Sequence, residues 1–290
     1  MANRILTKHS EVSLPDYLAT ATTWAIALLV TGLFGWMFGG IIYHGLPELS
    51  WTFLVSSPVD AGREGGIGPI LVSTGFIVVV CMLVSFPLGL CTAVLLAEWT
   101  LAEHPLGRVI RRSLDMLAGV PSIVFGLFGN AFFCVYLGMG FSIISGGLTL
   151  ACMVLPILVR STEEGLRSIP HHYRLSATAL GLSRTAMLKH LLIPMAIPGL
   201  IAGFILGLGR AVAETAALIF TSGYVDRMPS SLWDSGRALS IHIFDLSMNV
   251  PGGDGNAYAS ALVLIIILIW TNSASTWLGK AWLHQKAGTP

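Results

Sequence analysis

Two charged side chains, Arg210 and Glu214, lie within a stretch of the chain that is otherwise almost entirely apolar. A charge at the centre of a membrane helix costs roughly 2.5–3.5 kcal/mol on insertion scales, so such side chains face a protein interior or a partner helix rather than lipid. Positions i and i+4 share one face of a helix, where the two side chains can form an ion pair. Arginine also suits oxyanions, because its planar guanidinium can donate two parallel hydrogen bonds to phosphate. The pair therefore fits two roles, an ion pair that fixes helix packing or a site for an anion crossing the membrane.

Glu214 could serve such an anion in two ways. It could hold Arg210 in position, or it could accept the proton of hydrogenphosphate, which sulfate does not carry at neutral pH. Arg160, at the inner end of another apolar stretch, is a second candidate cation. Thr215 could donate its hydroxyl to an anion, although hydroxyls in helices often bond to their own backbone.

Other chemistries find little support in the sequence. The neighbouring histidines His171 and His172 have no second cluster of metal ligands, so we interpret them as part of a solvated loop. The four cysteines lie in apolar runs without CxxC spacing. A GxxxxGKS/T motif is absent, so the chain has no phosphate-binding loop for ATP. We expect no catalytic residue, no metal and no cofactor bound by this chain.

The composition identifies the environment in which these residues lie. The chain has 290 residues, of which 54% are hydrophobic and 11% are charged, and its mean hydropathy is +0.77. Soluble domains carry roughly 25% charged residues. We therefore predict a multi-pass membrane protein and exclude the soluble, disordered and disulfide-rich secreted classes. A formal net charge of +1 gives no reason to expect binding to nucleic acid.

Six stretches are long and apolar enough to cross a bilayer as helices, which requires roughly 20 mostly apolar residues. They run over Thr22–Tyr43, Ile70–Leu96, Leu114–Leu137, Phe141–Val159, Pro198–Thr221 and Tyr258–Lys280. The fifth stretch also carries glycines four residues apart, a spacing that permits close contact between helices. These glycines are Gly199, Gly203 and Gly207. We predict an all-α fold with six transmembrane helices.

The distribution of basic residues predicts the orientation. Of the 16 Lys and Arg residues, twelve lie in one set of alternate connecting segments, and Arg63, Arg227 and Arg237 lie in the opposite set. Basic residues concentrate on the cytoplasmic side of membrane proteins. Both termini are therefore expected in the cytoplasm, in agreement with an even number of crossings.

The longest inner connection, residues 160–198, differs from a simple link between two helices. Helix-to-helix connections usually contain about 2–8 residues, whereas this one is long, charged and helical in its periodicity. Gly181 falls where a helix would end, and Pro194 precedes the next apolar stretch. We expect short helices joined at Gly181, lying at the cytoplasmic face and available to a partner.

This segment resembles the cytoplasmic motif of ABC importer permeases, in which EAA is followed by three residues, Gly, nine residues and I-x-L-P. Here Leu175-Ser176-Ala177 precedes Gly181, and Leu191-Leu192-Ile193-Pro194 follows at the family's spacing. The chain departs from the pattern at Leu175, where the family has Glu, and at Ser176. In that family the motif forms a coupling helix that fits a groove on a separate ATPase subunit. The resemblance implies ATPase coupling through Leu175, Ala177, Gly181 and Pro194.

Further blocks resemble the permeases of phosphate importers, of the PstA type. They comprise Gly65–Pro69, Pro87–Gly89, Ala97–Trp99, Gly119–Leu127, Leu155–Glu164 and Gly209–Ala216. Together they cover most of residues 65–221 in the family's order, while the first apolar stretch, the outer loops and the tail match less well. The resemblance implies that Arg160, Arg210 and Glu214 border the substrate path, and we add Thr215 from its position.

The resemblance also implies a type I ABC importer permease in the bacterial cytoplasmic (inner) membrane, a transport subunit rather than an enzyme. Residues 1–69 would hold the N-terminal segment, first helix and first outer loop, residues 70–280 the permease core with its coupling loop 160–198, and residues 281–290 a cytoplasmic tail. The implied partners are a sister permease of the PstC type, an ATPase dimer of the PstB type that binds ATP, a phosphate-binding protein of the PstS type, and the lipid bilayer.

Three alternatives remain open. The cargo could be another oxyanion. An ion-coupled secondary transporter would work without partner chains, but the long inner loop and the lack of a visible inverted repeat argue against it. A membrane enzyme that uses Glu214 or the histidine pair would need polar residues on several helices, whereas the sequence concentrates them on one.

Overall fold

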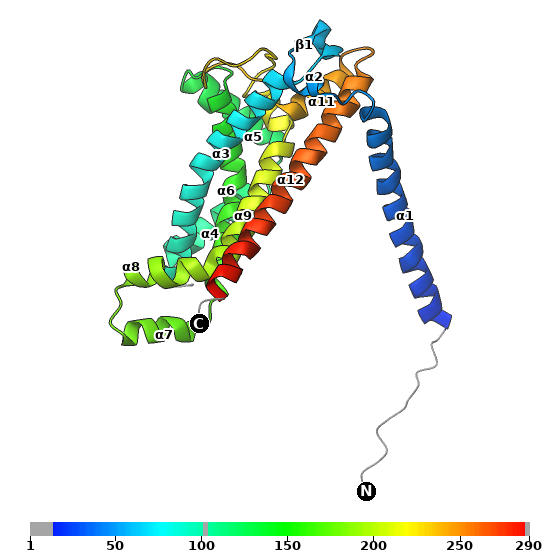
Figure 1. Ribbon diagram of the computed structural model, residues 1–290. Coiled ribbons are helices and arrows are strands. Elements are labelled where there is room, and N and C mark those ends of the chain that lie inside the picture. Colours follow the sequence, from blue (N-terminus) through cyan, green and yellow to red (C-terminus); the bar gives the residue numbers. More distant parts are fainter. Residues whose placement is uncertain (1–13, 101–103, 288–290) are drawn as a thin grey trace.

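The computed structural model describes residues 14–100 and 104–287, and most of them are helical (Figure 1). The long helices are α1 (Leu14–Gly45), α3 (Gly68–Val94), α6 (Ile143–Arg167), α9 (Ile193–Ala213) and α12 (Asp254–Ala287). The shorter helices are α2 (Trp51–Val55), α4 (Pro105–Ala118), α5 (Ser122–Gly129), α7 (His171–Ala179), α8 (Arg184–Met187), α10 (Ala216–Ile219) and α11 (Leu239–Met248). π-Helical turns extend α3, α5 and α8 over Leu95–Trp99, Asn130–Tyr136 and Leu188–Leu192. Two short antiparallel strands, β1 (Pro58–Val59) and β2 (Glu64–Gly65), flank a 3-10 turn, Asp60–Gly62.

The predicted all-α fold with six crossings is confirmed. Five of the described helices, α1, α3, α6, α9 and α12, are long and apolar enough to cross a membrane, and the bent pair of α4 and α5 supplies the sixth crossing. The described ends of the chain, at Leu14 and Ala287, lie on the same side of the bundle as α7 and α8 (Figure 1). Residues 1–13 and 288–290, which belong to the predicted terminal segments, lie outside the described residues.

The third crossing is not one straight helix. The prediction of Leu114–Leu137 is wrong at its start, because the chain bends by 103° between α4 and α5. The bend falls at Gly119-Val120-Pro121, where proline disfavours a helical conformation of the preceding residue and has no N–H to donate. The third crossing is therefore a broken span, in which α4 packs its buried Leu114 against the inner ends of α3 and α6 and α5 with its π-helical extension follows the bend.

The fifth crossing is interrupted. The sequence predicted one helix over Pro198–Thr221, but α9 ends at Ala213 and Glu214 is extended, with φ −75° and ψ 133°. A break at this depth is tolerated where the freed backbone groups find partners. The hydroxyl of Ser240, on α11, donates to the Glu214 carbonyl at 2.6 Å, and the main-chain N–H of Ala217 donates to the Glu214 carboxylate at 3.4 Å. These contacts stabilise the break and start α10.

The close contact predicted along the glycines of α9 is confirmed. A Cβ placed at Gly199 would lie 2.6 Å from the Cα of Gly165 on α6, and one at Gly203 would lie 2.9 Å from the Cβ of Ser161. Because these distances leave no room for a side chain, the two helices approach at backbone distance. α6 also packs along α3, so α3, α6 and α9 form the centre of the bundle.

α1 stands apart from this bundle and meets it at its outer end (Figure 1). There the ring of His44 stacks on that of Tyr258, on α12, with 5.0 Å between their centroids. A Cβ at Gly45 would lie 2.7 Å from the Tyr258 carbonyl oxygen. Most side chains of α1 are exposed and apolar around the whole helix, which is the pattern of a membrane span.

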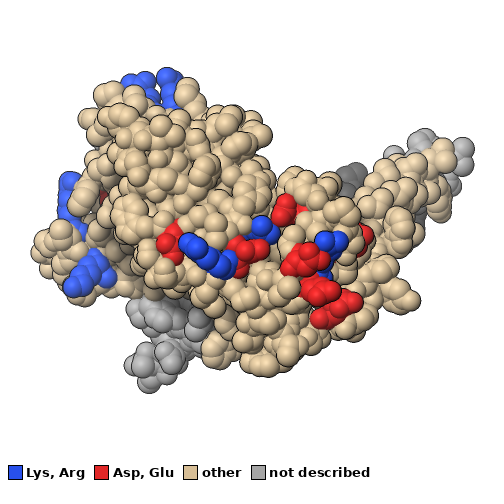
Figure 2. Space-filling model, turned by 90° about the horizontal axis from the view of Figure 1, so that it is seen from above, with Lys and Arg blue, Asp and Glu red and all other residues tan. Residues whose placement is uncertain are grey.

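The outer end of the bundle is covered by α2, the hairpin of β1 and β2, and α11 (Figure 1). Seen from this side, acidic and basic side chains lie close together in a band across the surface, and further basic side chains appear at its edges (Figure 2). At α11 the buried Arg237 forms an ion pair with Asp245 at 3.2 Å and donates to Nδ1 of His242 at 3.4 Å. Burial lowers the pKa of His242 from 6.5 to about 4; Arg237 adds to this effect and Asp245 opposes it. The histidine is therefore neutral at neutral pH.

Candidate functional site

Arg210 lies in the last turn of α9, directly before the break. Its Nη2 atom is 3.7 Å from a carboxylate oxygen of Glu214 and 3.8 Å from the sulfur of Met153, on α6. The Glu214 side chain is buried, whereas the Arg210 side chain is 48% exposed. The two charges are neighbours, as the i, i+4 spacing predicted, although the helix ends between them. A half-exposed guanidinium at this depth requires a partner chain, water or an anion beside it.

The exposed part of Arg210 borders a hollow of about 320 Å³ between α9 and α12. Thr271 and Asn272, on α12, line it together with Arg210 and apolar residues. The hydroxyl of Thr271 donates to its own helix, at the Leu268 carbonyl. The Asn272 amide is exposed and makes no hydrogen bond to any residue that the structure describes. These two residues were not among the predicted site residues, although the polar side chains between Thr271 and Thr276, within an otherwise apolar stretch, were a visible signal.

Thr215 lies at the break itself and is not brought into the hollow. Its carbonyl accepts the main-chain N–H groups of Leu218 and Ile219 at 3.1 Å each, so that the residue starts α10. Glu214 does not line the hollow either, but it contacts Arg210, which does. The structure thus places Arg210 at the hollow, with Glu214 and Thr215 directly behind it.

Arg160 lies elsewhere, near the inner end of α6. Arg210 contacts Met153, and the seven residues from Met153 to Arg160 span about 10 Å of helix. Arg160 forms an ion pair with Asp115 of α4, donates to the Arg111 carbonyl at 3.1 Å, and lies 3.6 Å from Glu163. The two cations proposed for the substrate path therefore occupy different levels of the bundle.

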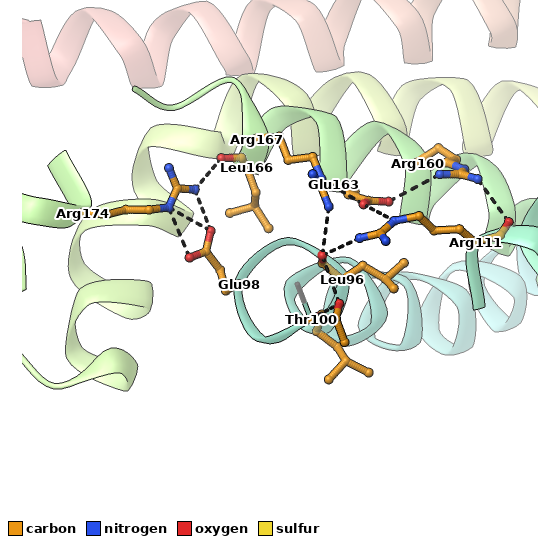
Figure 3. A network of polar contacts seen from close by, with 10 residues as sticks. Leu96, Glu98, Thr100, Arg111, Arg160, Glu163, Leu166, Arg167 and Arg174 are labelled. Atoms are coloured by element: carbon orange, nitrogen blue, oxygen red, sulfur yellow. Dashed lines mark hydrogen bonds and ion pairs between the residues drawn. The ribbon is translucent and has the colours of Figure 1, made fainter. Parts of the chain in front are cut away.

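Glu163 is the centre of the polar network around Arg160 (Figure 3). Its buried carboxylate accepts Nε of Arg111 and Nε of Arg167, each at 3.0 Å. The same two arginines donate to the Leu96 carbonyl at 2.8 and 3.1 Å, in the π-helical turn that ends α3. This network joins α3, α4 and α6 at the cytoplasmic end. The contacts of Glu163 with Arg160 and Arg167 are local in sequence, but the contacts of Arg111 with Glu163 and of Arg167 with Leu96 join residues far apart.

The inner connection forms two short helices joined at Gly181, as predicted. α7 ends before Gly181, which has φ +74°, the left-handed conformation that favours glycine after a helix. α8 follows and continues through its π-helical turn into α9, whose first turn contains Pro194. Leu175 is exposed and Ala177 is buried. We call α7 and α8 with this turn the coupling hairpin, residues 171–192.

A second ion pair ties the coupling hairpin to the bundle. Arg174, on α7, contacts Glu98, in the turn that ends α3, with its closest atoms 2.6 Å apart. Its guanidinium also donates to the carbonyls of Leu166 and Ile169, at the end of α6, at 2.9 and 2.8 Å. The contact between residues 98 and 174 was not predictable from the sequence, because 76 positions separate them.

Comparisons with known proteins identify the family. A family model described as the binding-protein-dependent transport system inner membrane component matches residues 85–284. The chain belongs to this family. The matched region contains the break in α9, the coupling hairpin and the charge network.

Several relatives match over most of their length. The probable ABC transporter permease protein YqgI of Bacillus subtilis (strain 168) is 34% identical over 91% of this chain and 95% of its own. The phosphate transport system permease protein PstA 2 of Mycobacterium bovis is 29% identical over 91% and 89%. The phosphate transport system permease protein PstA of Mycobacterium leprae is 31% identical over 82% and 79%.

Solved structures of ABC importers share the fold. A chain of a bacterial alginate ABC transporter, in complex with an alginate-bound periplasmic protein, superposes with a TM-score of 0.65 at 13% identity and covers 92% of this chain and 96% of that one. A chain of the inward-facing MetNI methionine ABC transporter gives a TM-score of 0.57 at 17% identity, over 75% and 94%. The protein is therefore a multi-pass inner-membrane protein with the type I permease fold. Members of this family are permease subunits of ABC transporters rather than enzymes, and they act with other chains of the transporter.

Proposed function

We propose that this chain is one of the two permease subunits of an ATP-driven importer of inorganic phosphate. The observation that carries the proposal is the half-exposed guanidinium of Arg210 at the break in α9, facing a hollow within the membrane-spanning region. The names of the PstA relatives support phosphate as the cargo. A phosphate oxyanion would meet a planar donor group there, which favours paired hydrogen bonds.

The surroundings of Arg210 favour weak, transient binding of an anion over tight binding. Its contact with Glu214, at 3.7 Å, is longer than a hydrogen bond, so part of its charge and donor capacity remains available. Glu214 offsets the charge enough to keep anion binding weak, and a transported ion must be released as readily as it is bound. The Asn272 amide adds donors on the opposite wall of the hollow. Arg160 and Thr215 would act at the inner mouth and at the break, respectively.

The energy for transport would come from partner chains. In this proposal an ATPase dimer of the PstB type contacts the exposed residues of the coupling hairpin, a sister permease of the PstC type completes the path, and a PstS-type binding protein delivers phosphate to the outer face. Exposed apolar side chains such as Leu175 and Leu180 provide contacts for a groove on an ATPase. Closure of the ATPases would then move the hairpin and shift the bundle between two states. This chain itself would bind no cofactor.

Uptake of radiolabelled phosphate tests the proposal. Cells that lack the gene would be complemented with the wild type, Arg210→Gln or Arg108→Gln, and the level of each protein in the membrane would be measured. Arg108 is a matched control, because it is an exposed cytoplasmic arginine on α4. We expect rescue by the wild type and by Arg108→Gln, loss of uptake with Arg210→Gln, and little competition from excess sulfate. Uptake that does not depend on the gene, or that sulfate abolishes, would contradict phosphate as the cargo.

A further inference from the structure

Within the coupling hairpin, α7 is attached to the bundle through few side chains, whereas the turn after α8 continues into α9. Among the residues of α7, all of which the structure describes, Ala177 is the only buried one. Arg174 supplies the main polar attachment, with its three nitrogens directed at Glu98 and at the end of α6. Its Nε lies 3.2 Å from each oxygen of Glu98, and its Nη2 lies 2.6 Å from one of them. Both side chains are largely shielded from solvent, which strengthens charge-assisted hydrogen bonds.

The contacts of Glu98 continue into the rest of the bundle. Glu98 and Leu96 belong to the same π-helical turn at the end of α3. The Leu96 carbonyl accepts from Arg111 of α4 and from Arg167 of α6 (Figure 3). Any displacement of this turn therefore acts directly on both helices.

The last contacts of the network lie beside the bend before α5. Arg111 binds the buried Glu163, and Arg160 pairs with Asp115 near the end of α4. Four residues after Asp115 the chain reaches Gly119, where the bend into α5 begins. Figure 3 shows two groups of contacts, one between Arg174 and Glu98 and one from Leu96 to Arg160, and the backbone of the turn Leu95–Trp99 joins them. Rigid networks of this kind can carry a displacement between distant sites, and perturbing their members tests whether they do.

We propose that Arg174 and Glu98 transmit movement of the coupling hairpin to the end of α3, and that the arginines around Glu163 pass it on to α4 and the crossing α5. The proposal rests on the proposed function, because it requires ATPases that move the hairpin. Arg174 and Glu98 are positioning residues in it and do not touch the cargo. Their loss should therefore leave ATP hydrolysis in place and reduce the transport that accompanies it.

The test uses the complete importer in proteoliposomes, with this chain, its partner permease, the ATPases and the binding protein. Arg174→Gln and Glu98→Gln each remove the ion pair, and Arg174→Lys keeps the charge without the planar donor group. The double variant Glu98→Arg/Arg174→Glu restores opposite charges in exchanged positions. Arg108→Gln is the control, because this exposed arginine lies outside the network. Phosphate uptake, ATP hydrolysis and the amount of ATPase that copurifies are measured for each.

We expect each Gln variant to retain bound ATPase and to move about tenfold less phosphate per ATP hydrolysed, because the charge-assisted hydrogen bonds between positions 98 and 174 are lost. The phosphate moved per ATP by Arg174→Lys should lie between the values for the Gln variants and the wild type. The double variant with exchanged charges should regain part of the coupling. If the Gln variants moved as much phosphate per ATP hydrolysed as the wild type, the proposal would be overturned. Loss of ATPase binding in both Gln variants without recovery in the exchanged pair would also overturn it, since the ion pair would then serve assembly alone.

A second measurement separates this proposal from the choice of cargo. Hydrogen–deuterium exchange of α5 is compared before and after the ATPases are trapped with ATP and vanadate, without any phosphate gradient. In the wild type and Arg108→Gln, trapping should change the exchange of α5, whereas in Arg174→Gln the change should be lost. If the wild type carries no phosphate but differs from Arg174→Gln in the exchange of α5, the assignment of phosphate as cargo is wrong. The transmission from Arg174 and Glu98 to α5 is then still supported. If trapping changes the exchange of α5 equally in all variants, Arg174 and Glu98 do not transmit the movement to α5, whichever cargo is carried.

Discussion

The guanidinium of Arg210 and the carboxylate of Glu214 lie 3.7 Å apart, across the point at which α9 ends and the backbone becomes extended. Glu214 is held on two sides, because its carboxylate accepts from Ala217 and its carbonyl accepts from Ser240. Arg210 is held less firmly and is half exposed. Glu214 thus restricts the position of Arg210 and partly offsets its charge, while the guanidinium of Arg210 remains available to an anion.

Removing the charge of Glu214 should strengthen anion binding and slow transport. Glu214→Gln keeps an oxygen for the Ala217 N–H and leaves the carbonyl bond to Ser240 intact, so the break in α9 should persist. Without the opposing charge, Arg210 should hold phosphate about fivefold more tightly, from roughly 1 kcal/mol of ion-pair energy. Initial uptake rates over a range of phosphate concentrations should show a lower KM and a lower maximal rate. Unchanged values for both would show that Glu214 serves the fold only, and Glu64→Gln on β2 is the control.

The contact between α6 and α9 predicts a packing defect from a single methyl group. A Cβ at Gly199 would lie 2.6 Å from the Cα of Gly165, and a backbone atom cannot move aside as a flexible side chain can. Gly199→Ala should therefore destabilise the protein by about 1–3 kcal/mol, the usual cost of overpacking. Thermal unfolding in detergent, followed by tryptophan fluorescence, measures the change. Gly75→Ala on α3 is the matched control, since nothing lies within 4 Å of its added Cβ; an equal loss there would refute the packing argument.

Gly181 offers a test of the hairpin geometry that is separate from packing. A Cβ there would meet nothing within 4 Å, but the residue has φ +74°, which β-branched side chains rarely adopt. Gly181→Val should strain or reshape the turn at a cost of about 1–2 kcal/mol, and phosphate moved per ATP should fall about tenfold. Gly181→Asn should stay near the wild type, because asparagine tolerates this conformation. Both variants should insert normally, and full coupling in Gly181→Val would show that the turn is not important for docking.

Features that depend on local sequence were predicted well. Apolar length predicted the crossings, since each helix must span the same thickness of lipid. The turn at Gly181 followed from the preference of glycine for a left-handed conformation, and the contact of α6 with α9 followed from the spacing of Gly199 and Gly203. The bend before α5 was missed, although Pro121 marks it, because the apolar stretch continues through the bend on both sides.

Features that depend on distant residues could not be predicted. The break at Glu214 has no glycine or proline within it. It is stabilised by Ser240, which lies 26 positions later in the sequence, on α11. Glu98, the ion-pair partner of Arg174, lies 76 positions away, and Asp115, one partner of Arg160, lies 45 positions away. Arg160 was a candidate for the substrate path because of its charge and depth, but a single chain position does not reveal whether a charge is already paired. The role of each site residue remains a prediction that the transport experiments test.

The buried histidine of the outer layer predicts a dependence of stability on pH. His242 is fully buried, and its Nδ1 accepts from Arg237 because a guanidinium can only donate. Its pKa is lowered from 6.5 to about 4 by burial, with Arg237 adding to the effect and Asp245 opposing it. Between these two values the unfolded chain binds more protons than the folded one, so stability is complete above about pH 6.5 and falls as the pH drops towards 4. The full effect is about 3 kcal/mol.

Thermal unfolding of the purified protein at a series of pH values measures this dependence. Carboxylates also titrate in this range, so the wild type is compared with His242→Gln, in which the side-chain oxygen can still accept from Arg237. The variant should lose less stability than the wild type as the pH falls through this window, because it has no imidazole to protonate. His190→Gln is the control, since this histidine is exposed at the cytoplasmic end and should leave the wild-type slope unchanged. Parallel curves for the wild type and His242→Gln would show that the buried imidazole does not govern the acid sensitivity of the outer layer.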